Sequence, residues 1–123
     1  MKACRDLDLD FVVVYTEADK DSGHVRNTIT SGPEKNAWRI ASYTDANELF
    51  SVADYTECTA IHPGYGFLSE DFRFARRAAT RDRPITFIGP DWKIIRDLGD
   101  KINVKKVAKS LGIPTVPGTY GPI

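Results

Sequence analysis

A chain of 123 residues is long enough for one domain with a modest hydrophobic core. Seventeen basic residues balance seventeen acidic ones, so no overall field draws the chain to nucleic acid or to an anionic membrane. Cys4 and Cys58 are isolated from each other, which indicates two reduced thiols in a reducing compartment. Because no long apolar run and no signal-peptide pattern is present, we expect a cytoplasmic protein, or an organelle-matrix protein whose targeting segment has been lost.

Apolar runs of strand length alternate with segments of helical periodicity, which predicts a largely parallel sheet flanked by helices. The first residues, 1–7, are expected to be the end of a helix, and residues 19–27 to be polar and irregular. The β-branched run at residues 11–15 predicts a strand buried on both faces. The expected strands are residues 11–15, 28–30, 59–61 and 85–88.

Helices are predicted wherever a capping residue precedes an apolar face of helical spacing. The expected caps are Thr44, Ser69, Asp91 and Asp100. We expect Gly99 to end its helix in a left-handed conformation, and Gly112 with Pro114 to end the last helix. The positions expected to point inward are Ala46, Leu49, Phe50 and Ala53; Phe72, Ala75 and Ala79; Ile94, Ile95 and Leu98; and Val104, Val107, Ala108 and Leu111.

The segment from Ala60 to Glu70 is the most informative part of the chain. It predicts a short strand ended by Pro63 and Gly64, then a turn, then a helix start at Ser69. Ligands bind beyond the carboxyl ends of strands in open α/β sheets, and helix N-termini there offer free N–H groups. The segment therefore predicts a binding loop.

The sequence at this loop resembles the N-terminal domain of biotin carboxylase, the ATP-using component of acetyl-CoA, propionyl-CoA and pyruvate carboxylases. The resemblance rests on His-Pro-Gly-Tyr-Gly-Phe-Leu-Ser-Glu at 62–70, Phe-Ile-Gly-Pro at 87–90, Gly-Asp-Lys at 99–101 and Gly-Ile-Pro-Thr-Val-Pro-Gly at 112–118. Ala18-Asp19, His24-Val25 and the opening Ala3-Cys4-Arg5 fit the same family, so the resemblance runs nearly end to end. Residues 26–42 depart from the family's pattern, in which an acidic Ala-Asp-Glu segment follows the His-Val pair.

The resemblance implies a doubly wound, Rossmann-like α/β domain of the pre-ATP-grasp type, with a mostly parallel sheet. Members of the family open with a strand, whereas this chain opens within a helix, so we expect a domain that lacks its central first strand. Met1 is accordingly expected to be an internal methionine of a longer protein. The implied division is a domain at 1–114, truncated at the front, and a linker at 115–123 towards an ATP-grasp domain.

The resemblance also implies the activity. The complete enzyme would use ATP with magnesium and bicarbonate to carboxylate biotin carried on a partner. The implied partners are the ATP-grasp remainder of the subunit, a biotin carboxyl carrier protein and a carboxyltransferase. A homodimer is implied as well, with Lys2, Arg5 and Asp6 of the opening helix as interface candidates. The 123 residues alone are expected to be inactive, and the final acceptor of the carboxyl group cannot be assigned from this domain.

Site residues follow from the matching motifs. Lys101, in Gly-Asp-Lys, is expected to contact ATP, although a lone lysine at a helix start is usually solvated. The loop residues expected to border the biotin pocket are His62, Gly64, Tyr65, Gly66 and Glu70. His62 also fits a structural histidine before a proline, and Glu70 equally fits a helix-start carboxylate. We assign no catalytic residue to this chain. We also assign no metal site, because acidic surface loops are far commoner than a metal site built from Asp19, Asp21 and His24.

Two other classes remain open on the sequence. One is the N-terminal domain of another ATP-grasp ligase, such as a carbamoyl-phosphate synthetase or an aminoimidazole ribonucleotide carboxylase. The other is a non-catalytic α/β interaction module. A dinucleotide oxidoreductase is disfavoured, because the Gly-x-Gly-x-x-Gly fingerprint is absent. The leading hypothesis requires the Tyr65 loop and the Lys101 amine to converge on one cleft.

Overall fold

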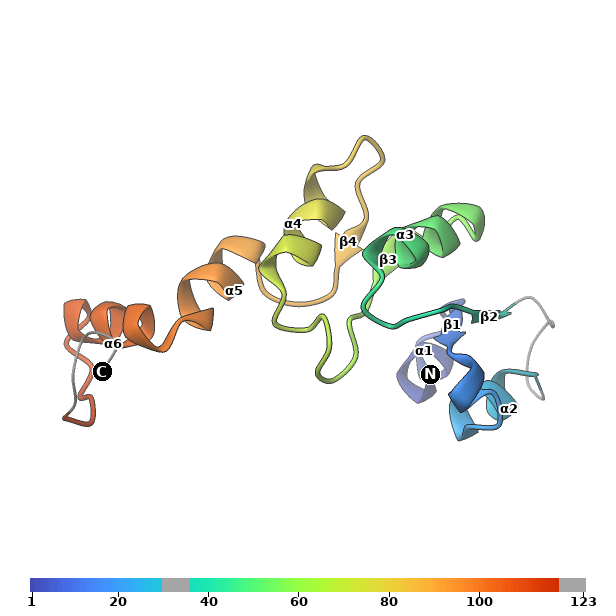
Figure 1. Cartoon of the computed structure of the whole chain (residues 1–123), viewed down its shortest axis with the longest axis horizontal. Helices are drawn as coiled ribbons and strands as arrows, with labels where there is room; N and C mark the ends of the chain where they lie inside the picture. Colours follow the sequence, from blue (N-terminus) through green and yellow to red (C-terminus); the bar gives the residue numbers. More distant parts are fainter. Residues whose placement is uncertain (30–35, 118–123) are drawn as a thin grey trace. The chain divides into compact units, whose positions relative to one another are not determined.

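The computed structural model describes residues 1–29 and 36–117, apart from the side chains of Ile29 and Lys101 (Figure 1). Its helices and strands alternate along the chain and fall into two compact units, Met1–Ile61 and His62–Ile123. The first unit holds α1 (Lys2–Asp6), β1 (Val13–Tyr15), η1 (Glu17–Asp19), α2 (Gly23–Ile29), β2 (Ala37–Arg39), α3 (Ala46–Tyr55) and β3 (Ala60–Ile61). The second holds α4 (Phe72–Thr80), β4 (Thr86–Phe87), α5 (Trp92–Gly99) and α6 (Lys101–Ser110).

The first unit is organised around the parallel pair of β1 and β2. Val14 lies opposite Trp38 in this pair, and the Ile40 N–H donates to the carbonyl of Tyr15 at 2.8 Å. Helix α2 packs against both strands. The buried side chains of this unit are Val25, Thr28, Ile40, Phe50 and Ala53.

The expectation that residues 11–15 form a strand buried on both faces is wrong in extent and in burial. The strand spans only Val13–Tyr15, and all three side chains are half-buried. A two-stranded pair is too narrow to shield both faces of a strand from water.

The segment expected to be irregular, residues 19–27, is largely helical. It contains the end of η1 and most of α2, whose first turn is held by the Val25 N–H donating to the Ser22 carbonyl at 3.0 Å. The short strand expected at 28–30 is also wrong, because Thr28 and Ile29 end α2; Thr30 lies outside the described residues. Val25 and Thr28, three residues apart, are both buried. Tertiary packing of this helical face therefore outweighs the low helix propensity of the polar and β-branched residues in this segment.

Helix α3 begins one residue later than expected. Its cap is Asp45, whose carboxylate accepts the N–H groups of Asn47 and Glu48, and Thr44 is therefore not the cap. Phe50 and Ala53 are buried on the predicted face. Strand β3 confirms the strand expected at 59–61.

The second unit has its core between α4 and β4, which lie side by side in Figure 1. Helix α4 buries Phe74, Ala75 and Ala78, and Ile85 before β4 is buried with them. The buried face of α4 differs from the predicted one. Of the three residues predicted to point inward, Ala75 is buried, whereas Ala79 is exposed and Phe72 is only half-buried. In this helix of nine residues, the position of β4 decides which face is buried. Alanine occurs on both buried and exposed faces, so the alanines of the sequence do not indicate which face of the helix is buried.

Helices α5 and α6 keep their predicted caps, Asp91 and Asp100. Their apolar residues are more exposed than expected, with Ile94 51% and Leu98 50% exposed. Val104, Val107 and Leu111 are exposed as well, because a helix buries an apolar stripe only where another element covers it. Among the described residues, no helix is long and apolar enough to cross a lipid bilayer.

The two glycines expected to end helices behave differently. Gly112 has φ +70° and follows α6, with its N–H donating to Lys109 and the Ile113 N–H donating to Ala108. This is the double hydrogen bond of a Schellman motif, as predicted. Gly99 is instead the last residue of α5 without a positive φ, and the chain turns at the extended Asp100.

Candidate functional site

The loop after β3 is tightly coiled. Within four residues it contains three left-handed conformations, at Gly64 (φ 70°), Gly66 (φ 76°) and Phe67 (φ 44°). Two of these positions need glycine for conformational reasons, and a phenylalanine there is strained. The sequence therefore fixes an unusual backbone at the place where binding was predicted.

The loop is held by its own hydrogen bonds and by one buried side chain. The Ser69 N–H donates to the Gly66 carbonyl at 2.9 Å, and the Asp71 N–H donates to the Leu68 carbonyl at 3.2 Å. Leu68 is 8% exposed and anchors the loop in the second unit. The backbone around Tyr65 is thereby shaped before any ligand arrives.

Ser69 does not cap a helix, which corrects the sequence-based prediction. Helix α4 begins three residues later, and the Asp71 carboxylate accepts the N–H groups of Arg73 at 2.8 Å and Phe74 at 3.4 Å. Aspartate caps through a charged acceptor, which is a stronger partner for these donors than a hydroxyl. The helix start therefore does not present these N–H groups to a ligand of the loop.

His62 has a structural contact. Its Nδ1 accepts the N–H of Gly64 at 3.0 Å, so in the neutral ring the proton sits on Nε2. This hydrogen bond tightens the turn directly after Pro63. The contact favours the structural interpretation of His62 over a role as a base.

Tyr65 and Glu70 lie on the outside of the loop. The side chain of Tyr65 is 100% exposed, and Glu70 is exposed as well. A fully exposed aromatic ring on a pre-shaped loop is available to a ligand or to another protein segment. The role of the loop residues His62, Gly64, Tyr65, Gly66 and Glu70 at a biotin pocket stays a prediction.

Lys101 is the first residue of α6, and its side chain lies outside the described part of the structure. The preceding Asp100 accepts the N–H groups of Ile102 at 2.7 Å and Asn103 at 3.4 Å. These two donors are thus already satisfied, so a phosphate at this end of α6 would depend on the Lys101 amine. Its convergence with the Tyr65 loop also stays a prediction.

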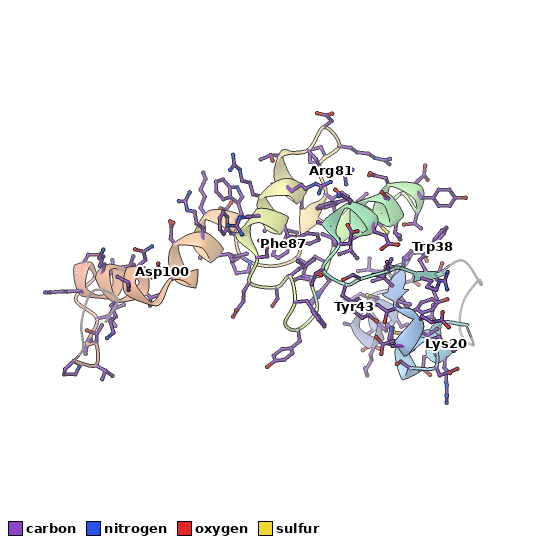
Figure 2. The ribbon with its side chains drawn as sticks, viewed as in Figure 1. Lys20, Trp38, Tyr43, Arg81, Phe87 and Asp100 are labelled. Atoms are coloured by element: carbon purple, nitrogen blue, oxygen red, sulfur yellow. The ribbon has the colours of Figure 1, made fainter. Side chains whose placement is uncertain are left out.

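A polar cluster that the sequence analysis did not identify lies after β1. The Tyr43 hydroxyl donates to Asp19 Oδ2 at 2.6 Å, and the Thr16 hydroxyl donates to the same oxygen at 3.2 Å. Figure 2 marks Tyr43 on the segment between β2 and α3. The parallel pairing of β1 and β2 could have indicated this cluster. The residues that follow two parallel strands lie at the same edge of the sheet.

Two pKa values are shifted in this cluster. The Tyr43 hydroxyl, with smaller contributions from Thr16, His24 and Ser22, holds the pKa of Asp19 below its usual value. Burial first, and then the hydrogen bond to Asp19, raises the pKa of Tyr43. The Asp19 carboxylate is thus hydrogen-bonded by the hydroxyl groups of Tyr43 and Thr16. The described residues contain no group of three His, Cys, Asp or Glu side chains that could hold a metal ion.

The charged residues of α1, considered above for a dimer interface, have partners within the chain. Lys2 pairs with Asp6, and Arg5 donates to the carbonyl of Asn27 at 3.0 Å. These contacts fit ordinary surface charges.

Parallel strands alternating with helices, and a coiled loop at a strand end, define a Rossmann-like α/β domain. The sequence matches the family described as "Biotin carboxylase, N-terminal domain" over residues 1–95. The chain therefore belongs to the biotin carboxylase N-terminal domain family.

Individual relatives support the same assignment. The chain is 40% identical to the biotin carboxylase of Haemophilus influenzae, over 100% of this chain and 27% of that protein. It is 40% identical to the mitochondrial methylcrotonoyl-CoA carboxylase subunit alpha of Arabidopsis thaliana, over 98% of this chain and 16% of that one.

A solved structure has the same fold. The biotin carboxylase domain dimer of Hydrogenobacter thermophilus 2-oxoglutarate carboxylase, in complex with MgADP, ADP and bicarbonate, superimposes with a TM-score of 0.86. The two sequences are 38% identical, and the match covers 98% of this chain and 26% of the solved chain. The chain thus spans about a quarter of the length of this relative and of the Haemophilus enzyme.

Proposed function

We propose that this chain serves as the N-terminal part of a biotin carboxylase, an ATP-dependent ligase that carboxylates biotin carried on a partner protein. The observation that carries the proposal is the family match over residues 1–95, joined to 40% identity with a biotin carboxylase along the whole chain. The coiled loop at 62–70 supports it, because a pre-shaped backbone at a strand end suits ligand binding. Other ATP-grasp ligases and a non-catalytic module gain no comparable support.

The chain would contribute one wall of the active site. Lys101 would bind a phosphate of ATP through its amine, since the neighbouring N–H groups already bond to Asp100. Bound MgATP would supply the phosphoryl group that activates bicarbonate. The loop from His62 to Glu70 would border the biotin pocket, with the exposed ring of Tyr65 covering the substrate. The remaining ligands would come from the ATP-grasp part of the enzyme.

The partners and location belong to the same proposal. The complete enzyme would work with a biotin carboxyl carrier protein and a carboxyltransferase, and would form a dimer, as the Hydrogenobacter domain does. We place it in the cytoplasm or in an organelle matrix. The relatives include both a bacterial enzyme and a mitochondrial subunit.

A chimeric enzyme tests the proposal directly. This chain would replace the matching quarter of the Haemophilus influenzae biotin carboxylase, and carboxylation of free biotin would be followed by ATP- and bicarbonate-dependent incorporation of labelled carbon. We expect activity well above that of the truncated enzyme without any N-terminal part. A folded chimera without activity would contradict the proposed function.

Two lysine variants of α6 locate the ATP contact within this chimera. Lys101→Gln is expected to raise the KM for ATP at least about tenfold, because it removes a charge-assisted contact to phosphate. Lys106→Gln is the matched control, since Lys106 is an exposed lysine of the same helix outside the Gly-Asp-Lys motif. Equal KM values for the two variants would refute the role of Lys101.

A further inference from the structure

Helix α6 carries a row of apolar side chains on its open side. Val104 is 37% exposed, Val107 38% and Leu111 69%, and their spacing of three and four residues places them on one face of the helix. We call these three side chains the α6 stripe. Asn103 and Ser110 border the stripe on one side, and both are exposed and uncharged. The stripe is therefore an apolar surface that extends over two helical turns.

The covered side of α6 has the opposite composition. Helix α6 packs against α5, and within residues 102–110 the half-buried positions are Ile102, Lys105 and Ala108. A surface helix ordinarily turns its apolar stripe inward and its charged residues outward. In α6 a lysine lies on the covered side, while two valines and a leucine are exposed to water. The contact with α5 therefore does not account for the apolar pattern of this helix.

A helix of this kind depends on tertiary packing for its stability. Helix α6 spans ten residues, Lys101–Ser110, and isolated helices of this length are marginal in water. Its N-terminus is capped by Asp100, which Figure 2 marks at the junction of α5 and α6, but a cap contributes only part of the stability that a helix needs. Burial of the stripe against another apolar surface would contribute the rest.

The similarity to relatives points to what covers the stripe. The N-terminal domain family matches residues 1–95, a range that ends inside α5. The alignment with the Haemophilus biotin carboxylase nevertheless runs through the whole of this chain, which spans 27% of that enzyme. Helix α6 thus lies beyond the matched N-terminal domain and inside the region shared with the complete enzyme. An element at this place is positioned to pack against the part of the enzyme that follows.

We propose that the α6 stripe is a docking surface for the part of a biotin carboxylase that follows this N-terminal region, and that α6 is fully stable only when docked. The proposal rests on the proposed function, which supplies this partner. The stripe has no charged member, so its complement is an apolar protein surface. Because Lys101 is the first residue of α6, docking would also fix the position of the proposed ATP contact.

Hydrogen exchange, measured by mass spectrometry on the isolated chain and on the Haemophilus chimera, tests the proposal. In the isolated chain the amides of residues 104–111 are expected to exchange with little protection, because α6 opens easily without its partner. In the chimera the same amides are expected to exchange at least about a hundredfold more slowly. This measurement needs no turnover, so its result is independent of the activity assay.

Serine variants of α6 locate the docking surface. In the chimera, Leu111→Ser and Val107→Ser are each expected to speed exchange of α6 at least about tenfold, because each removes an apolar side chain that the docked partner buries. In the isolated chain Leu111→Ser is expected to change exchange less than about twofold, since Leu111 is 69% exposed there. Lys106→Ser is the matched control in the chimera. Lys106 is exposed, lies away from the stripe, and has a helix propensity close to that of leucine.

The results of these measurements decide for or against the docking surface. Slow exchange of α6 in the chimera that is lost in both stripe variants and kept in Lys106→Ser supports it. The proposal is overturned if α6 exchanges equally fast in the chain and in the chimera, if the stripe and lysine variants have equal effects, or if the chimera does not fold. It is also overturned if the isolated chain protects α6 and Leu111→Ser removes that protection, because the stripe is then covered by another part of this chain or by a second copy.

The docking surface and the proposed function can fail separately. A folded but inactive chimera with a protected α6 would contradict the proposed function and support the docking surface. An active chimera in which α6 exchanges as fast as in the isolated chain would support the function and overturn the docking surface.

Discussion

At the scale of single residues, Tyr43 connects two parts of the first unit that are distant in the sequence. Its hydroxyl donates to Asp19 and accepts the Thr16 N–H at 3.3 Å, so one phenol joins the end of β1, the η1 turn and the segment before α3. This arrangement stabilises the conformation of residues 16–19. Irregular structure had been expected from Asp19 onwards. The Tyr43 side chain, more than 20 residues away in the sequence, therefore stabilises a segment whose own sequence does not predict regular structure.

Replacing Tyr43 by phenylalanine should reduce stability in a pH-dependent way. The hydroxyl holds the pKa of Asp19 below its unfolded value, so its contribution is present above that value and is lost as the pH falls through the folded pKa. We expect Tyr43→Phe to lower the free energy of unfolding at pH 7. The difference from the natural chain should shrink as the pH falls below about 4, the ordinary aspartate range.

Urea unfolding, followed by circular dichroism at several pH values between 3 and 7, measures this difference. Tyr55→Phe is the control, because Tyr55 is 76% exposed and contributes its ring to an edge-on contact with Trp38. The control should show little change at any pH. A destabilisation by Tyr43→Phe that stays constant over this range would contradict the assigned hydrogen bond.

At the scale of the helices, the end signals were predictable only in part, since Thr44 and Ser69 are not caps and Gly99 has no positive φ. Asp91, Asp100 and Gly112 act as the sequence predicts, because a cap or a left-handed glycine is determined within a few residues. The buried faces of α4 to α6 depend on which neighbours cover them, and sequence periodicity carries no information about that. Helix α2 was missed for the same reason, since its polar start only becomes stable through the buried Val25 and Thr28.

The cap of α4 gives a direct test of one corrected prediction. Asp71→Ala removes the acceptor for two helix N–H groups and should lower the free energy of unfolding by about 1 kcal/mol. Ser69→Ala, at the position expected from the sequence, should change it by no more than a few tenths of a kcal/mol. Chemical denaturation of both variants at pH 7 decides between the two caps. A larger loss in Ser69→Ala would restore the original prediction.

The two helix-ending glycines should respond oppositely to alanine. Gly112 has φ +70°, and a Cβ atom added there would meet no heavy atom within 4 Å, so Gly112→Ala incurs only the backbone penalty of about 1 kcal/mol. Gly99 lies at the end of α5 without a positive φ, and Gly99→Ala should stabilise by up to about 0.5 kcal/mol. Thermal unfolding of the two variants measures both signs, and a destabilising Gly99→Ala would indicate a left-handed residue after all.

At the scale of the whole molecule, family and fold were predictable from a few short motifs, whereas the site was predictable only in part. The motif at 62–70 lies on a loop whose left-handed residues explain the spacing of Gly64 and Gly66. The polar cluster at Asp19 has a signal only at the level of strand pairing, because it is assembled from segments that meet after folding. The division into a domain at 1–114 and a linker at 115–123 stays a prediction.

We expect the 123-residue chain by itself to lack carboxylase activity. It matches only 27% of the Haemophilus enzyme, and the proposed ATP contact is a single lysine whose neighbouring helix donors are already bonded to Asp100. One lysine cannot neutralise and orient a triphosphate with its magnesium ion, which in phosphoryl transfer requires several convergent ligands. ATP hydrolysis and biotin carboxylation by the purified chain should therefore equal the buffer background, while the chimera with the Haemophilus remainder turns over. Activity of the isolated chain above background, retained in Lys101→Gln, would show that its chemistry is of another kind.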